Sequence, residues 1–179
     1  MAEVSGGDKA KPYLEAIAAK LGRAKAVRVG FLENATYPDG TKVAMVAAIQ
    51  EFGAPRAGIP PRPYFRTMIA KESPTWGVKV AATLKAYDND ALSALEAIGL
   101  GIESQLRESI IEVNSPALSE VTLMLRMMRS QDQSLVVTGK TVAIARARVA
   151  AGERAQGVNT KPLDDTGHML NSVASEVKL

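Results

Sequence analysis

The chain of 179 residues contains no cysteine and a single histidine, and only 4% of its residues are aromatic. Without cysteine it can form no disulfide, no thiolate metal site and no cysteine nucleophile. The one histidine, His168, leaves little material for a histidine-based zinc site or a Ser-His-Asp triad. These absences argue against most familiar enzyme chemistries, so we expect no catalytic residue, no metal ion and no cofactor.

The sequence also lacks long apolar runs and dense clusters of charge. It has no run of 18 apolar residues, and the segment from Met1 to Lys11 lacks the apolar stretch of a secretory signal. We therefore expect no membrane contact and synthesis in the cytoplasm. The net charge is +3 with no cluster of five or more Lys and Arg, so charge alone does not predict nucleic-acid binding.

What the sequence does contain is the balance of a folded domain, with 46% hydrophobic and 23% charged residues. The pattern predicts a flexible N-terminal arm at 1–11 and a single α+β domain at 12–179. Alternating apolar residues predict strands at 25–32 and 172–179. Apolar spacings of three and four predict helices at 12–21, 41–52, from 63 through 69, at 75–113 with a break at 87–90, at 119–128 and at 141–151, with a short helix or turn at 163–170.

The predicted fold class is therefore α+β, mainly helical with a small antiparallel sheet. Two strands make a marginal sheet on their own, so we expect contacts between subunits to complete it. In the last strand, Val173 and Val177 should pack inward, while Glu176 and Lys178 face solvent or a channel. An unpaired strand edge is a surface to which a neighbouring chain can add a strand.

Two glycines interrupt the longest apolar helical stripe, which runs from Leu92 to Val113. Gly99 and Gly101 should each cost about 1 kcal/mol relative to alanine in a helix interior. They are tolerable where another backbone packs closely against the helix, and otherwise they predict a kink.

Two short patterns suggest chemistry but have plainer interpretations. Residues 137–141, Val-Thr-Gly-Lys-Thr, end like a phosphate-binding loop, but Ser134 stands where that pattern needs its first glycine. We interpret them as a helix start with Thr138 as the cap. Asp165, close to His168, is predicted to cap the turn that follows it rather than to bind a metal.

Five arginines in the C-terminal third leave two interpretations open. They could form a basic face towards DNA, or they could be the solvated flanks of helices, which is the commoner case. The five are Arg126, Arg129, Arg146, Arg148 and Arg154.

Residues 54–63 hold four prolines and one glycine, a density through which neither helix nor sheet continues. We therefore expect a stiff, irregular loop. Because proline fixes φ, such a loop loses little entropy on ordering, and it suits the presentation of a contact surface.

Two segments of the chain carry a resemblance to a known family. The first is E-F-G at 51–53 followed by I-P-P-R-P-Y-F-R at 59–66, and the second is K-P-L-D-D-T-G-H-M-L-N-S at 161–172. In this order they resemble the tail-completion, or head–tail joining, proteins of long-tailed bacteriophages. Tyr64 stands where that family usually has phenylalanine.

The resemblance implies a structural virion protein that forms a ring in the neck, between the DNA-filled head and the tail, and that is made in the cytoplasm of the bacterial host. It implies as partners copies of the same chain in a six- or twelve-fold ring, and neighbouring connector and tail proteins. Double-stranded DNA would pass through the lumen without sequence-specific contact. The alternatives are a tail-terminator ring protein and, in a different class, a basic helical DNA-binding protein.

Interface residues are expected around the proline loop and along the last strand. Arg62 and Arg66 are the expected anchors of the loop, because arginine offers a planar donor with several hydrogen bonds. The full set of candidate interface residues is Phe52, Arg56, Ile59, Arg62, Tyr64, Phe65, Arg66, Asp165, Val173 and Val177.

Overall fold

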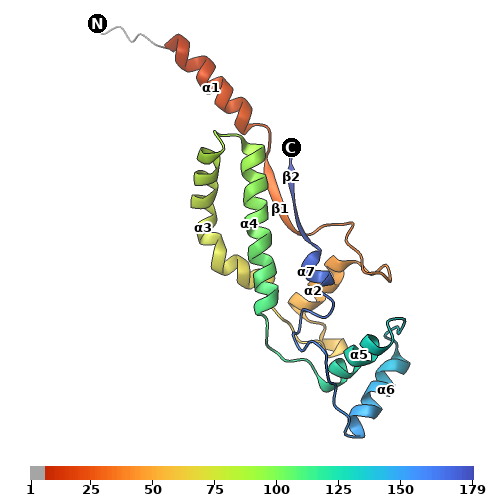
Figure 1. The fold of residues 1–179 in the computed structure, drawn as a ribbon. Helices are drawn as coiled ribbons and strands as arrows, with labels where there is room; N and C mark the ends of the chain where they lie inside the picture. The colour runs from red at the N-terminus through yellow and green to blue at the C-terminus, as the bar shows by residue number, and fades with distance from the viewer. Residues whose placement is uncertain (1–6) are drawn as a thin grey trace.

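The structure is a computed structural model that describes residues 7–179. Over this range the chain forms helices and two strands, which confirms the predicted α+β class (Figure 1). In chain order the elements are α1 Gly7–Leu21, β1 Ala26–Phe31, α2 Val43–Phe52, the 3₁₀ helix η1 Pro55–Ala57, α3 Phe65–Ala86, α4 Ala91–Glu112, α5 Glu120–Gln131, α6 Gly139–Ala150, α7 His168–Asn171 and β2 Val173–Lys178.

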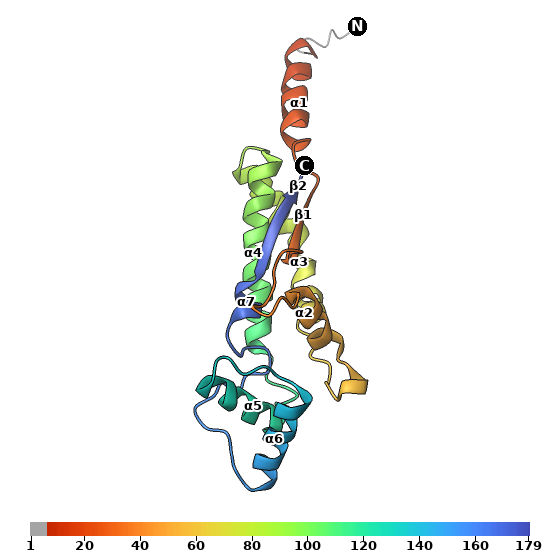
Figure 2. The same cartoon turned by 90° about the vertical axis from the view of Figure 1, so that its right-hand side faces the viewer.

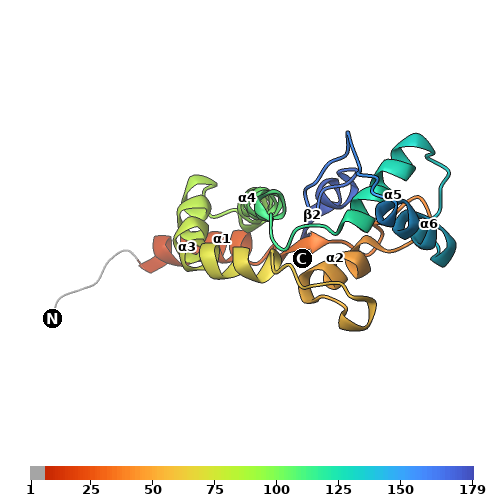
Figure 3. The ribbon, with the colours of Figure 1, turned by 90° about the horizontal axis from the view of Figure 1, so that it is seen from below.

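The two predicted strands are confirmed, and they pair with each other. β1 and β2 are antiparallel, in a register that runs from Ala26 opposite Lys178 to Phe31 opposite Val173. Because side chains alternate along a strand, Val173 and Val177 share one face of this sheet. Helix α4 covers that face, and α3 packs on the far side of α4, so the order of layers is α3, α4, sheet (Figure 3).

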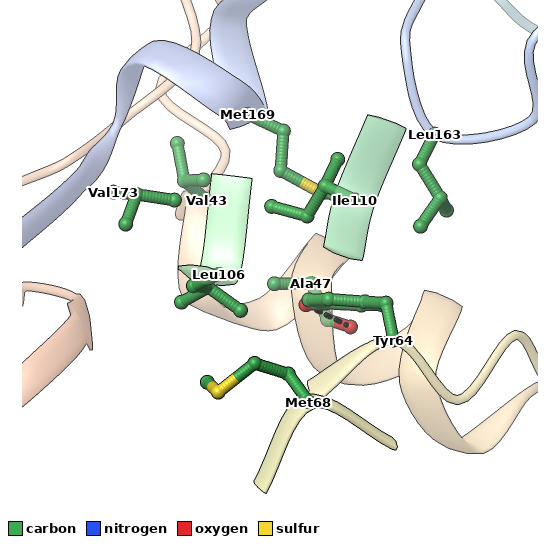
Figure 4. Packing of buried hydrophobic residues seen from close by; sticks show 9 residues of the cluster. All are labelled: Val43, Ala47, Tyr64, Met68, Leu106, Ile110, Leu163, Met169 and Val173. Atoms are coloured by element: carbon green, nitrogen blue, oxygen red, sulfur yellow. Dashed lines mark hydrogen bonds between the residues drawn. The ribbon is translucent and has the colours of Figure 1, made fainter. Parts of the chain in front are cut away.

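A core cluster of nine residues joins α4 to elements from both ends of the sequence (Figure 4). We call the part of the chain that it holds together the body. Leu106 and Ile110 of α4 lie at its centre, and both are fully buried. The other members come from the first half of the chain and from its C-terminal segment: Val43, Ala47, Tyr64, Met68, Leu163, Met169 and Val173.

Helices α5 and α6 form a second, smaller cluster, which we call the lobe. It is centred on Met124, Met127, Met128 and Ala145, and it lies at the opposite end of the molecule from α1 (Figures 1 and 2). The lobe contains the predicted Thr138 cap, whose hydroxyl accepts from the backbone N–H of Thr141. The residues that end like a phosphate-binding loop are therefore a helix start.

Two helices differ most from their predicted limits. α1 begins at Gly7 rather than at Pro12, so the predicted arm at 1–11 overlaps this helix, and residues 1–6 lie outside the described part. α3 runs without interruption from Phe65 to Ala86 and includes Pro74. A proline removes one backbone hydrogen bond and kinks a helix, and the ribbon of α3 bends between its first part and the part that runs along α4 (Figure 1). The predicted break at 87–90 is confirmed.

Helix α1 projects past the end of the α3–α4 hairpin (Figures 1 and 2). An ion pair between Lys20 and Asp88 ties its last turn to the turn between α3 and α4. Its apolar residues Tyr13, Leu14 and Leu21 are exposed. Within the described residues this helix therefore packs little of its apolar surface.

Candidate interface

The first motif segment begins with a carboxylate that caps a helix. Glu51, at the end of α2, is buried, and its Oε2 accepts from the backbone N–H of Phe65 at 2.9 Å. Its Oε1 accepts from the N–H of Arg66 at 3.3 Å and pairs with the Arg66 guanidinium at 3.1 Å. A negative charge at a helix N-terminus is stabilising, because the free N–H groups there carry partial positive charge. Glu51 thus joins the end of α2 to the start of α3.

Between these helices, residues 53–63 form a projection that we call the finger (Figure 2). Gly53 begins it with a φ of 77°, and a Cβ at this position would lie 2.8 Å from the Pro61 nitrogen and 2.9 Å from the Ile59 oxygen. No side chain fits there, so glycine is required for the chain to close on itself. Two backbone hydrogen bonds between Ala54 and Ile59 then fix the base of the loop.

Arg62 lies inside the chain instead of facing a neighbouring subunit. It is only 4% exposed. Its Nε and Nη2 donate to the Pro116 carbonyl at 3.2 and 3.1 Å, and its Nη1 donates to Gln50 Oε1 at 3.2 Å. Burial, and next the nearby charge of Arg126, lower the pKa of Arg62. The expectation that Arg62 is an exposed anchor is wrong, because its donors hold the finger to the α4–α5 connection.

Tyr64 is also an internal residue. It is 2% exposed, and its hydroxyl donates to the Ala47 carbonyl at 3.2 Å, the dashed contact in Figure 4. Burial raises the pKa of the Tyr64 phenol, with a further contribution from the charge of Glu51. Its backbone carbonyl accepts from the Ser109 hydroxyl of α4 at 2.7 Å. Tyr64 therefore packs the start of α3 against the body.

The accessible members of the predicted set gather on the outside of the finger and of its flanking helix ends. Phe52 is 66% exposed, and the Arg66 guanidinium lies over its ring at 5.3 Å from the centroid. Such a cation–π contact holds the aromatic ring in place at the surface. Arg56, in η1, is exposed, while Ile59 and Phe65 are half-buried. An anchored finger that presents an aromatic ring and cationic groups is a preformed contact surface.

The second motif segment is held by one arginine of α5. Arg126 Nη1 donates to the carbonyls of Asn159, Lys161 and Asp164 at 2.6, 2.9 and 3.2 Å, and its Nε pairs with Asp165 Oδ1 at 3.3 Å. One guanidinium therefore organises the whole bend at the start of the segment. Nothing local in the sequence indicates this role, because the carbonyls that it binds lie more than 30 positions away.

Asp165 does not cap the following helix. Its second oxygen pairs with Arg129 at 3.4 Å, so both of its oxygens face arginines of α5. α7 begins after Gly167, whose positive φ of 72° makes the turn, and the first backbone N–H of that helix, from His168, donates to the Thr166 hydroxyl at 3.4 Å. The prediction of a cap is wrong, because the long-range ion pairs of Asp165 replace the local hydrogen bond.

The two motif segments meet at the joint between body and lobe. Leu163 is buried in the body core, and Lys161 Nζ donates to the Ile111 carbonyl in the last turn of α4 at 2.9 Å. Tyr64 of the first motif segment belongs to the same buried cluster as Leu163 of the second. The resemblance-bearing residues thus form one connected structural joint, from which the finger projects.

The two candidate interface residues in β2 also differ in their exposure. Val173 is 1% exposed and belongs to the body core, whereas Val177 is half-buried opposite Val27. On the outer face, Glu176 pairs with Arg28 at 3.7 Å and with Lys178 at 3.0 Å. Among residues 7–179, no third strand pairs with β1 or β2. A neighbouring chain could therefore contact this sheet through the backbone groups at its edges, and not through the side chains of Val173 and Val177.

Four of the five arginines considered as a basic face have acidic partners. Besides Arg126 and Arg129, which share Asp165, Arg148 pairs with Glu153 at 2.8 Å and Arg154 with Glu120 at 3.9 Å. Arg146 is exposed on α6. These contacts fit the interpretation of solvated helix flanks and internal ties.

Within the described part of the chain, no cluster of three His, Asp or Glu side chains could hold a metal ion. The same residues include no helix with the length and apolar character of a membrane span. Comparisons with protein-family models, with curated protein sequences and with solved structures find no match to this chain.

Proposed function

We propose that the chain is a structural protein of a bacteriophage virion, which forms a ring in the neck and joins the DNA-filled head to the tail. The observation that carries the proposal is the anchored finger. Arg62 and Glu51 fix it from inside, while Arg56 lies on its surface and Phe52 and Arg66 lie on the surface of the helix ends beside it. A surface that is ordered before binding loses little entropy on assembly. Its partners would be copies of the chain and adjacent connector and tail proteins.

The extent of the surface supports a subunit of an assembly. The chain has 11672 Å² of accessible surface at a mass of 19.0 kDa. A compact monomer of this mass would expose about 8,400 Å². Interfaces of permanent complexes bury roughly 2,000–5,000 Å², so the excess is of the size that a ring subunit covers on assembly.

The test is deletion of the gene from the phage that encodes the chain, followed by complementation in trans. For a neck protein we expect DNA-filled heads and finished tails to accumulate separately in electron micrographs. A complementing copy with Phe52→Ala and Arg56→Ala should fold normally and enter virions poorly, because both side chains are exposed and outside the anchoring contacts. Val78→Ala, at an exposed position on α3, is the matched control. Normal incorporation of the finger variant would contradict the proposal for this surface.

The same deletion distinguishes the alternatives. A tail-terminator ring protein predicts tails of abnormal length in place of finished, unattached tails. A basic DNA-binding protein predicts affinity of the free chain for duplex DNA that falls steeply with salt. We expect such binding to be weak, because Arg129, Arg148 and Arg154 already have acidic partners.

A further inference from the structure

An apolar hollow lies between α3 and α4. It has a volume of about 180 Å³, and its lining includes Trp76, Thr83, Ala97, Ile98, Gly101 and Ile102. The indole N–H of Trp76 donates to Gln105 Oε1 at 3.0 Å. The polar atom of Trp76 is therefore satisfied within the chain, and its ring is free to form an apolar wall.

The two glycines of α4 differ in their surroundings, and the difference shows which side of the hollow is uncovered. A Cβ on Gly99 would lie 2.8 Å from Ser175 Oγ and 3.0 Å from Val27 Cγ2, so the close approach of the sheet explains that glycine. Gly101 is two residues later, about 200° around the helix, on the side turned away from the sheet. A Cβ there would meet nothing within 4 Å. Nothing in the described chain accounts for a glycine at this position.

Helix α1 presents the opposite feature, an apolar stripe without a surface to cover. Leu14, Ile17, Ala18 and Leu21 share one side of the helix, at spacings of three and four. Leu14 is 62% and Leu21 is 42% exposed. α1 points away from the α3–α4 hairpin of its own chain (Figure 1), so it does not cover the hollow of its own chain.

We propose that the apolar stripe of α1 from one copy of the chain lies in the α3–α4 hollow of a second copy. This contact would explain why residue 101 is glycine, because a residue without a side chain lets another helix approach closely. Lys79 lines the hollow, and its side chain is half exposed with only a long contact of 3.9 Å to Glu72, so it leaves room for a second acidic partner such as Glu15, which flanks the stripe. The stripe and the hollow are different surfaces of one chain, so the contact either propagates head-to-tail into a ring or is exchanged within a pair. This contact does not depend on a role in the phage neck.

The test uses two variants that each remove one of the two surfaces. The stripe variant carries Leu14→Asp and Leu21→Asp, and the hollow variant carries Gly101→Leu. Sedimentation of the full chain over a range of concentrations should show self-association, with the dissociation constant raised about tenfold or more in either variant, as expected when apolar contacts are lost. Circular dichroism checks that each variant folds. Val136→Asp, at an exposed position in the lobe, is the control and should associate normally.

Mixing the variants gives the sharper result. The stripe variant keeps its hollow and the hollow variant keeps its stripe, so an equimolar mixture should form 1:1 pairs that neither variant forms alone. Glu15→Lys and Lys79→Glu should each weaken association, and the two changes combined in one chain should restore it. The proposal is overturned if the unmodified chain stays monomeric at all concentrations, if Gly101→Leu associates normally, or if the mixture stays monomeric. None of these outcomes bears on the assembly phenotype that tests the neck function.

Discussion

The Nε, Nη1 and Nη2 atoms of Arg62 all donate hydrogen bonds within the chain, so the guanidinium stabilises the fold. Replacement by methionine keeps much of the apolar volume but leaves the Pro116 carbonyl and the Gln50 amide without their donor. We expect Arg62→Met to lower the free energy of unfolding by about 1.5–3 kcal/mol, the range for hydrogen bonds lost with a charged donor. Urea unfolding at pH 7 measures this loss. Arg56→Met, at the exposed tip of the finger, should change stability by less than about 0.5 kcal/mol. Equal effects at the two positions would contradict the internal role of Arg62.

Because of Tyr64, the stability of the body should fall as the pH becomes alkaline. Because burial raises the pKa of Tyr64 above its usual value near 10, the folded state favours the neutral phenol. This contribution to stability is complete below the unfolded pKa of about 10 and is lost as the pH rises through the folded pKa. Tyr64→Phe removes the titration and also the hydrogen bond to Ala47.

We therefore expect Tyr64→Phe to be less stable than the unmodified chain by about 1 kcal/mol at pH 7. The difference should shrink between pH 9 and pH 11. Urea unfolding across this range measures both effects. Tyr13→Phe, at an exposed position, should follow the unmodified chain at every pH. A difference for Tyr64→Phe that is independent of pH would show that the phenol does not titrate with unfolding.

At the scale of elements, α4 offers a matched pair of substitutions. Gly99→Ala places a methyl group within 3 Å of Ser175 and Val27, so the helix and sheet must separate. We expect a loss of about 1–3 kcal/mol, typical of overpacking. Gly101→Ala meets open space in the single chain and should stabilise it by about 0.5–1 kcal/mol, through helix propensity alone. Thermal unfolding of dilute protein gives both values, and the same sign for the two variants would contradict the packing.

The elements that could be predicted from the sequence depend on residues a few positions apart. The alternation in β1 and β2, the Thr138 cap and the break at 87–90 are of this kind. The continuity of α3 through Pro74 could not be predicted, because the local pattern shows where a proline disturbs a helix but not whether the same helix resumes beyond it.

The candidate interface was predictable only as a segment. The sequence indicates a stiff loop at 54–63, and the finger is that loop. Which of its side chains face outward depends on partners far along the chain: Arg62 binds a carbonyl 54 residues away, and Asp165 pairs with an arginine of another helix. Arginine in a motif is equally compatible with an exposed anchor and with an internal tie. Only the tertiary contacts distinguish these two roles.

At the scale of the whole molecule, β2 links assembly to folding. Val173 lies in the body core, and β2 pairs along the full length of β1. Removal of residues 172–179 would therefore remove core packing as well as a strand edge. For this reason a loss of ring incorporation in such a truncation would not by itself identify the edge of the sheet as an interface.

The body and the lobe differ in the size of their cores, and this predicts uneven stability along the molecule. The lobe cluster has four buried residues, against nine in the body. Regions with fewer buried contacts open at lower free energy than the core of the same protein. Amide hydrogen exchange should therefore be faster in α5 and α6 than in the central turns of α4.

Met124 tests whether this difference reflects separate units. It is fully buried at the centre of the lobe, and Met124→Ala should lower lobe stability by about 2–5 kcal/mol. Amide exchange in α5 and α6 should then accelerate while that in α4 stays unchanged. Leu106→Ala, in the body core, should accelerate exchange in α4 and β2. Equal acceleration in both parts by Met124→Ala would mean that the ties made by Arg126 and Leu163 couple body and lobe into one cooperative unit. In that case any force applied to the lobe in an assembly would act directly on the body and on the finger anchored to it.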